Sequence, residues 1–294
     1  MSARSDPLRV RPVPRLRVIE PRARGPLARA RELWEYRWLI GYFGRRYLEK
    51  RYSRTWLGLL WIPIRPLLDV GLRVLLFGGL LGVSSGHRPY FIFFVVGMSA
   101  WELFERTAYW ATRSLELSRS ILRQFFVPRL TALVGAVVPG GVDFLFYGAL
   151  TAVAASYYRI SRGAFYLDLT PDASWLGVLA GLLLLVLFAL GIGLWTSVFV
   201  ARARDIRFGF SYAMGFWFLV TPVIYPISAI PSQYRVIARA NPVTGPIEMV
   251  KHGMLGTAGA DTFSIVVSLV TIAAVLVSGL WFFGRSESAA VEQL

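Results

Sequence analysis

Residues 51–73 read RYSRTWLGLLWIPIRPLLDVGLR, and this stretch places charges inside an apolar run. The run is rich in Trp and Leu, yet it takes up Arg65, Asp69 and Arg73. It is therefore either a soluble basic helix or a membrane helix that keeps ionic groups for a reason. Charged residues within a membrane span normally face the bundle interior or a water-filled cavity. The rest of the chain decides between these interpretations.

The composition of the whole chain is that of a membrane protein. Apolar residues make up 55% of the 294 residues, and the mean hydropathy is +0.53. A soluble domain this apolar would expose patches that aggregate. Cysteine is absent, which excludes disulfides and thiolate metal sites. Histidine occurs only at His87 and His252, so a multi-histidine metal site is not expected either.

The net charge of +15 is concentrated near the N-terminus. Residues 1–56 hold fifteen Arg and Lys against five Asp and Glu, a net charge of +10. A basic segment beside a membrane helix marks the cytoplasmic side and attracts anionic lipid headgroups. No folded module that reads DNA is visible in the sequence. The charge therefore predicts membrane lipids, and not nucleic acid, as the partner of this segment.

Six apolar segments have about the ~20 residues needed to cross a bilayer as a helix. They lie at about 57–81, 91–112, 129–156, 175–200, 208–227 and 263–283. The loops at 113–128 and 201–207 are both net positive, which places them with the basic N-terminus on the cytoplasmic side. An even number of spans returns the C-terminus to the cytoplasm. The sequence thus predicts an all-α membrane protein with six spans.

The segments outside the spans are also distinct. Residues 1–30, rich in Arg and Pro, are predicted to form a flexible cytoplasmic arm, and residues 284–294 a cytoplasmic tail. Residues 31–56 mix charges with Trp34, Trp38 and Tyr42, which predicts a helix lying in the membrane interface.

Two predicted spans carry charges that are candidates for a functional role. In the first span Arg65, Asp69 and Arg73 recur every four residues, so they share one helix face. The second span adds Glu102, Glu105 and Arg106. Arg65 and Glu102 are expected at a similar depth, which predicts an ion pair between them. The alternative is that all these charges merely hold helices together.

Three further motifs occur in a fixed order along the second half of the chain: ARARDIRF at 201–208, TPVIYP at 221–226 and NPVTGPIE at 241–248. Together with RELWEYRWLI at 31–40 and SILRQFFVPRL at 120–130, they resemble the membrane subunits of type-2 ABC exporters. The nearest branch is the polysaccharide exporters, which are the permeases for O-antigen, teichoic acid and galactan. The resemblance covers about residues 31 to 283.

This resemblance implies a homodimer of six-span subunits in the bacterial inner membrane. A separate ABC ATPase, expected in two copies, would bind ATP and Mg, and the pair would move a lipid-linked polysaccharide outward. The resemblance also implies a coupling helix at about 113–128, which docks on the ATPase, and outer gate helices at about 229–256.

Candidate site residues follow from these expectations. The coupling residues are Leu115, Glu116, Arg119, Leu122, Arg123 and Phe126. Aromatic rings stack on the C–H faces of sugars, and the candidates for a belt along the path are Trp61, Phe77, Trp101, Trp217 and Tyr225. Prolines break helices because they lack a backbone donor, and the candidates for the outer gate are Pro222, Pro226 and Pro231. Asn241 is predicted to cap the next outer helix and Pro242 to occupy its first turn.

The motifs of common enzyme classes are missing from the sequence. There is no G-x-x-x-x-G-K-[ST] phosphate loop, no G-x-S-x-G and no D-x-D pair. We therefore expect no cofactor on this chain and no enzyme activity by itself. Three alternatives to polysaccharide export stay open. They are a type-2 exporter of a drug or small lipid, a membrane enzyme that modifies glycans with Glu102 and Glu105 as acid and base, and a proton-coupled carrier with Asp69, Glu102 and Glu105 as a relay.

Overall fold

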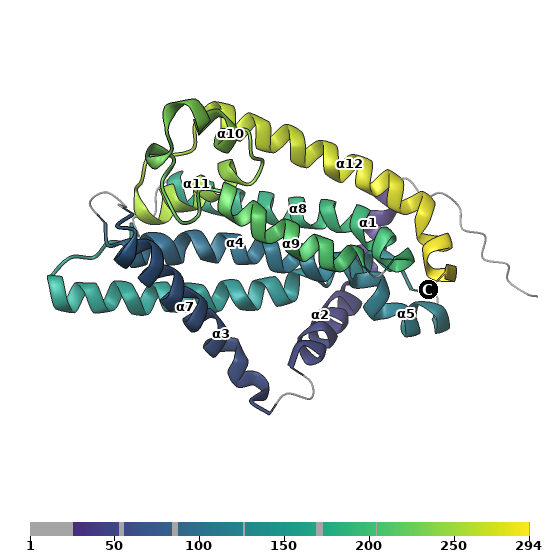
Figure 1. The fold of residues 1–294 in the computed structure, drawn as a ribbon. Coiled ribbons are helices and arrows are strands. Elements are labelled where there is room, and N and C mark those ends of the chain that lie inside the picture. The colour runs from purple at the N-terminus through teal and green to yellow at the C-terminus, as the bar shows by residue number, and fades with distance from the viewer. Residues whose placement is uncertain are drawn as a thin grey trace, which may run out of the picture.

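The computed structural model describes residues 26–52, 56–83, 88–125, 127–168, 173–203 and 205–293. Every regular element in these residues is a helix, which confirms the expected all-α class (Figure 1). Most of the predicted arm, residues 1–25, and the candidate Phe126 lie outside the described residues.

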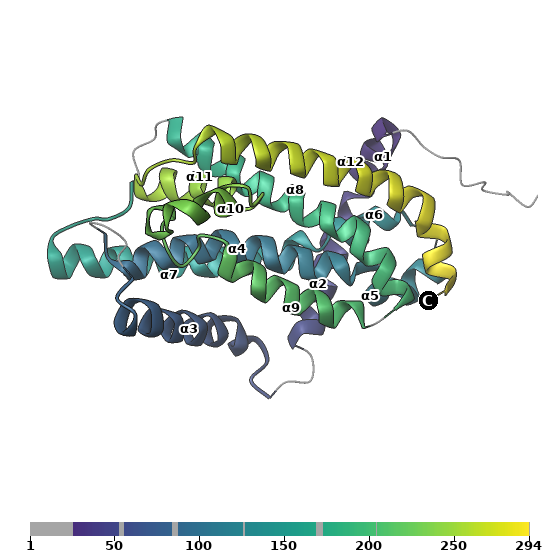
Figure 2. The same cartoon turned by 45° about the horizontal axis from the view of Figure 1, so that its top comes forward.

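Four long helices form the body of the subunit: α4 (Tyr90–Thr112), α7 (Val137–Arg162), α8 (Ala173–Arg202) and α12 (Thr262–Gln293). Helix α4 packs between α7 and α8, while α12 packs on α8. The stretch Ile92–Phe104 of α4 is buried without interruption, which makes α4 the centre of the fold. Figures 1 and 2 show these helices running side by side in both views.

Three of the predicted spans are confirmed as helices long and apolar enough to cross a membrane. They are Arg129–Arg162, Ser174–Arg202 and Thr262–Ser286. The first of these combines a short α6 (Arg129–Val134) with α7. Helix α12 continues beyond its apolar part, so most of the predicted tail at 284–294 is helical. Helix α4 matches the predicted span at 91–112 in position and carries three charges near its middle.

The first predicted span is irregular, and the fifth is shorter than predicted. The first consists of η1 (Gly58–Leu60), α3 (Trp61–Arg73) and the π-helix η2 (Val74–Leu80). Figure 2 shows α3 at the edge of the helical body, and Val70 of α3 is buried in the main core. The fifth, α9 (Ile206–Val220), ends well before the predicted boundary at 227. Its end is explained by Pro222, which has no backbone N–H to continue the helical ladder.

The two ends of the subunit carry different short helices. At one end lie α1 (Pro26–Glu35), α2 (Arg37–Tyr52) and α5 (Ser114–Gln124), so the predicted interface segment forms two helices. At the other end lie η3 (Ile227–Ala229), η4 (Ser232–Tyr234), α10 (Arg235–Arg239) and α11 (Thr244–Leu255). We call these the α5 end and the α11 end (Figure 1).

Helix α11 packs closely on α8 at the α11 end. Gly253 permits this approach, because a Cβ there would lie 2.3 Å from Cγ2 of Val178. A larger residue would push the two helices apart. The short helices of this end are thereby fixed to the body of the subunit.

Candidate functional site

A buried ionic cluster joins α2, α4 and α7. The carboxylate of Asp143 lies 2.8 Å from Nη1 of Arg51 and 3.0 Å from Nε of Arg106. Arg106 also pairs with Glu102 at 2.8 Å, one helical turn away on α4. Asp143 is only 2% exposed, and the charges alternate in sign along the chain of contacts. This alternation offsets the free-energy cost of burying the charges, because each ion has a partner of opposite sign.

The cluster corrects one pairing expected from the sequence. Glu102 binds Arg106, whereas Arg65 lies nearest to Asp69 on its own helix, at 3.9 Å. The expected Arg65–Glu102 pair is therefore not the one that the structure shows. The i, i+4 spacing of Glu102 and Arg106 on one helix explains the preference.

Sequence reasoning also missed Asp143 and Arg51 as members of the cluster. The available signal was a single acidic residue in the apolar stretch GGVDFLF at 140–146. A lone carboxylate in a span needs a basic partner. Nothing in the sequence pointed to Arg51 on the interface helix as that partner, because the two residues are far apart in the chain.

The remaining charged candidates on α3 and α4 contact less polar groups. The Arg73 guanidinium lies over the ring of Phe218, 4.5 Å from its centre, and Nη1 approaches the sulfur of Met98 at 3.5 Å. Glu105 accepts a hydrogen bond of 2.7 Å from the indole nitrogen of Trp101. Among the described residues, no group of His, Cys, Asp or Glu is arranged to hold a metal ion.

Aromatic side chains meet in the middle of the subunit. Phe104 stacks on Phe188 at 5.6 Å and meets Trp217 edge-on at 5.6 Å, while Trp101 packs against Phe218 at 5.4 Å. Of the five belt candidates, Trp101 is fully buried in this core. Three others are half-buried and pack against it: Phe77, Trp217 and Tyr225. Trp61 is exposed on α3.

Two buried polar residues, Asn241 and Lys251, connect the elements of the α11 end. The side-chain oxygen of Asn241 accepts hydrogen bonds from the indole of Trp217 at 2.9 Å and from the backbone N–H of Val243 at 3.1 Å. Its amide nitrogen donates to Thr221 at 2.8 Å. Asn241 thus ties the end of α9 to the start of α11. Pro242 precedes α11 and is not in its first turn.

Lys251 of α11 is fully buried and was not predicted to have a role. Its ammonium donates to the backbone carbonyl of Pro222 and pairs with Glu248 at 3.3 Å. It also lies 4.2 Å from the ring centre of Phe93. The non-helical backbone after α9 is thus satisfied by a side chain from α11. Of the other candidate prolines, Pro226 is half-buried and Pro231 is exposed.

The coupling candidates on α5 divide into inward and outward groups. Leu115 and Leu122 are buried in the core of the α5 end. Glu116 bonds Arg113 at 3.3 Å and Arg207 of α9 at 2.9 Å, so it connects two elements of the subunit. The outward face holds Arg119, Arg123 and the exposed ring of Phe125.

Helix α2 links α5 to the body of the subunit. The Tyr47 hydroxyl donates to the carbonyl of Ala132 at 2.9 Å and lies 3.1 Å from the hydroxyl of Ser118. Burial raises the pKa of Tyr47 well above its usual value, which keeps this donor protonated. Lys50 donates to the carbonyl of Leu117 at 2.7 Å, and burial lowers its pKa, as do the charges of Arg46 and Arg113.

Comparison with known proteins places the chain in a family. The model of the ABC-2 type transporter family matches residues 40–255, which include α4, α5 and α7 to α11. The chain belongs to the ABC-2 type transporter family. Its helical fold and its three apolar spans agree with a membrane subunit of such a transporter.

Curated relatives of this ABC-2 transporter chain carry a common name. The O-antigen export system permease protein RfbA of Myxococcus xanthus is 27% identical over 205 residues, which cover 69% of this chain and 74% of the relative. Two permeases of the same name from Klebsiella pneumoniae are each 25% identical. These alignments cover 68% and 71% of this chain and 73% and 78% of the relatives. The resemblance to type-2 ABC exporters drawn from the sequence is confirmed.

Proposed function

We propose that this chain is the membrane subunit of an ATP-driven exporter that moves a lipid-linked polysaccharide from the cytoplasmic to the outer face of the bacterial inner membrane. The observation that carries the proposal is the family match over residues 40–255 together with relatives named as O-antigen export permeases. Export of a drug or small lipid is less well supported, because none of these relatives bears such a name.

The energy for transport would come from a separate ABC ATPase. It binds ATP and Mg and docks on the outward face of α5, which carries Arg119, Arg123 and the exposed ring of Phe125. In this arrangement the α5 end is cytoplasmic, in line with the basic residues at 1–56. Both termini then lie in the cytoplasm, and the α11 end lies outside.

A movement of α5 would be transmitted to the membrane helices through two sets of contacts. One runs through Glu116 to Arg207 at the start of α9. The other runs through Tyr47 and Lys50 of α2 to Arg51 and the carboxylate of Asp143. Both routes consist of hydrogen bonds and ion pairs between packed elements, so a displacement of α5 strains them directly.

The path for the polymer would lie between two copies of the chain. Six spans per subunit are proposed, with α3 and α9 facing the partner, because both expose large apolar side chains such as Leu68, Leu72, Tyr212 and Phe216. Trp61, Phe77, Trp217 and Tyr225 are proposed to offer stacking surfaces to sugar rings. The Asn241 and Lys251 contacts would hold the outer gate around Pro222 and Pro226.

The first experiment is purification of the tagged chain from mild-detergent membranes, with identification and quantification of the proteins that co-elute. We expect an ABC ATPase in a ratio of one to one. Recovery of the chain without any ATPase, under several detergents, would contradict the proposal and favour an ion-coupled carrier.

A second experiment distinguishes the cargo. After depletion of the chain, we expect lipid-linked glycan to accumulate in the cytoplasmic leaflet while the polymer disappears from the cell surface. Unchanged surface polymer, together with altered sensitivity to drugs or altered lipid distribution, would instead support the alternative exporter.

A further inference from the structure

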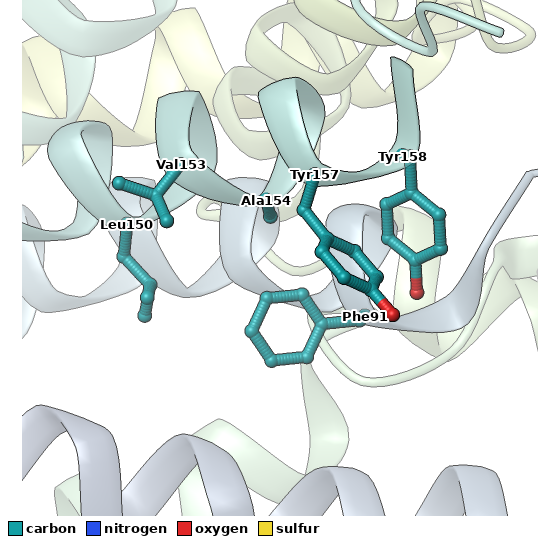
Figure 3. A pocket seen from close by; sticks show the side chains of 6 residues that line it. All are labelled: Phe91, Leu150, Val153, Ala154, Tyr157 and Tyr158. Atoms are coloured by element: carbon teal, nitrogen blue, oxygen red, sulfur yellow. The ribbon is translucent and has the colours of Figure 1, made fainter. Parts of the chain in front are cut away.

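An apolar groove lies between α4 and α7 near the α11 end. It has a volume of about 340 Å³ and is lined by Phe91, Leu150, Val153, Ala154, Tyr157 and Tyr158. Figure 3 shows the aliphatic side chains at one end of the groove and the two tyrosine hydroxyls at the other. A groove with this polarity suits a ligand that has a long apolar part and a polar head.

The depth of the groove in the helix fits a membrane boundary. At 1.5 Å per residue, the stretch of α7 from Val137 to Tyr157 spans about 30 Å, which equals the hydrocarbon thickness of a bilayer. The paired tyrosines then lie at the level where amphipathic rings gather in membranes. Residues beyond Tyr158 then lie at headgroup level. Figures 1 and 2 show this end of α7 projecting past the body of the subunit.

Two arginines lie directly beyond the groove. The Arg162 guanidinium lies 5.2 Å from the ring centre of Tyr158, and the Arg159 guanidinium lies 5.8 Å from that of Phe165. Both side chains are exposed, and no ion pair joins either of them to a carboxylate in the part of the chain that the structure describes. Their ring contacts use the faces of the guanidinium groups, so the N–H edges remain available to an anion.

A simpler role for these arginines is interaction with the end of α7. Basic residues in the last turn of a helix interact favourably with its dipole, and Arg159 and Arg162 occupy that turn. This role requires positive charge but not a guanidinium group, and it has no connection with the groove. The two roles therefore predict different effects of lysine substitution and of filling the groove.

We propose that this groove and the two arginines bind a membrane phospholipid with an anionic headgroup. One acyl chain occupies the groove beside Val153 and Ala154, and the phosphate accepts hydrogen bonds from Arg159 and Arg162. Charge complementarity selects this occupant, because a headgroup of net negative charge is attracted by two exposed guanidinium groups. Its phosphate also matches the fork of N–H donors that each guanidinium presents. The site is independent of the polymer that the exporter moves.

The test is native mass spectrometry of the purified full-length chain with phosphatidylglycerol and phosphatidylcholine that have the same acyl chains. We expect phosphatidylglycerol to bind about tenfold more tightly, because both lipids offer the same phosphate but the positive choline of phosphatidylcholine cancels the net negative charge that attracts the two arginines. In the double variant R159Q/R162Q this preference disappears. In R159K/R162K, which keeps the charge at the helix end, part of the preference remains. In Val153→Trp, which fills the groove, phosphatidylglycerol binding falls although both arginines are present.

The matched control is R285Q. Arg285 also has its guanidinium over a ring, 4.0 Å from the centre of Trp281, but it is far from the groove. We expect its lipid preference to equal that of the wild type. The proposal is overturned by an equal loss in R285Q, by no preference in the wild type, or by retention of the preference in R159Q/R162Q. Preference for a polyprenyl phosphate over phosphatidylglycerol would also overturn it, because the site would then belong to the cargo.

Discussion

At the scale of single residues, the structure gives the charged side chains of α2, α4 and α7 specific partners. Asp143 contacts two guanidinium groups that come from different helices. The sequence predicted that charges in the spans would face the interior. Glu102 is buried and Arg106 is partly buried, whereas Arg65 on α3 is exposed. The sequence could not predict which charges would pair, because pairing between helices depends on their rotation and depth, and a one-turn error changes the partner.

The first prediction concerns Asp143. The substitution Asp143→Ala leaves the largely buried Arg51 and Arg106 side chains without their shared carboxylate. Breaking a buried ion pair by removing one partner costs about 3–5 kcal/mol, so we expect a clear drop in the unfolding midpoint. The midpoint is measured by thermal unfolding in detergent, with tryptophan fluorescence as the probe.

The control for Asp143 is Glu49→Ala. Glu49 pairs with Arg45 at 2.9 Å on the exposed face of α2, and an exposed pair contributes at most about 1 kcal/mol. Equal destabilisation by the two substitutions would contradict a special role for the buried cluster.

The second prediction concerns Lys251, whose ammonium bonds the Pro222 carbonyl and Glu248. Lys251→Met leaves a buried carboxylate and a carbonyl without their donor, and we expect a loss of about 2–4 kcal/mol. In Lys251→Met/Glu248→Gln the unpaired charge is removed as well. The double variant should therefore be more stable than the sum of the single effects by about 1 kcal/mol or more. Strict additivity in the same unfolding assay would refute the pairing.

At the scale of elements, the sequence predicted the positions of the long helices well, because hydrophobic length depends on composition alone. It did not predict the π-helix Val74–Leu80, which has no compositional signal of its own. It placed the end of α9 too late, since the apolar stretch continues past Pro222 although the helix does not. Contacts between helices were beyond prediction, because they depend on which small residues meet.

The third prediction uses such a small residue. Gly193 of α8 meets α4, and a Cβ at Gly193 would lie 2.3 Å from the Cβ of Ala111. We expect Gly193→Ala to cost about 1–3 kcal/mol through overpacking, although alanine favours the helix itself. The matched control is Gly177→Ala in the same helix, where nothing lies within 4 Å. That control should be neutral or slightly stabilising, and a similar loss at both positions would argue against close packing of α8 on α4.

The fourth prediction concerns the link between α5 and α9. Glu116→Gln weakens the bonds to Arg113 and Arg207 while it keeps the size of the side chain. Because these groups are partly exposed, we expect a stability loss of about 1 kcal/mol or less. Transport should fall by more than this small loss of stability can explain, because one set of contacts between the ATPase-binding helix and the membrane helices is broken. Polymer export in cells and co-elution of the ATPase are the measurements.

The control for Glu116 is Arg119→Gln on the outward face of α5. We expect this substitution to weaken binding of the ATPase, whereas Glu116→Gln leaves binding intact and lowers export. If Glu116→Gln instead abolishes co-elution of the ATPase, Glu116 acts in docking and not in transmission.

At the scale of the whole molecule, composition predicted a membrane protein, and the family match agrees. The placement of the basic N-terminal segment at one face of the membrane stays a prediction. A single chain cannot show which exposed apolar surface contacts lipid and which contacts another protein, because both environments favour the same residue types. The two candidate surfaces are the outer face of α12 and the face formed by α3 and α9. The proposed homodimer requires the second.

The fifth prediction tests this choice, and the absence of cysteine makes the test direct. Single cysteines are introduced on α9 at Tyr212 and Phe216, on α3 at Leu68 and Leu72, and on α12 at Val270 and Val277, all of them exposed. Coexpression of an α3 variant with an α9 variant, followed by mild oxidation in membranes, should give a disulfide-linked dimer for at least one combination. A disulfide needs Cα atoms within about 7 Å, so it reports direct contact.

The α12 variants are the control for this experiment, since their side chains face lipid in the proposed dimer. Dimers formed through Val270→Cys or Val277→Cys, with none through α3 or α9, would place the interface on α12 and move the polymer path away from Trp61 and Phe77. Dimers formed through α3 and α9 would bring the exposed Trp61 and the half-buried Phe77 and Trp217 to the space between two subunits. A stacking path for sugars requires these rings to line one shared space, which neither subunit encloses by itself.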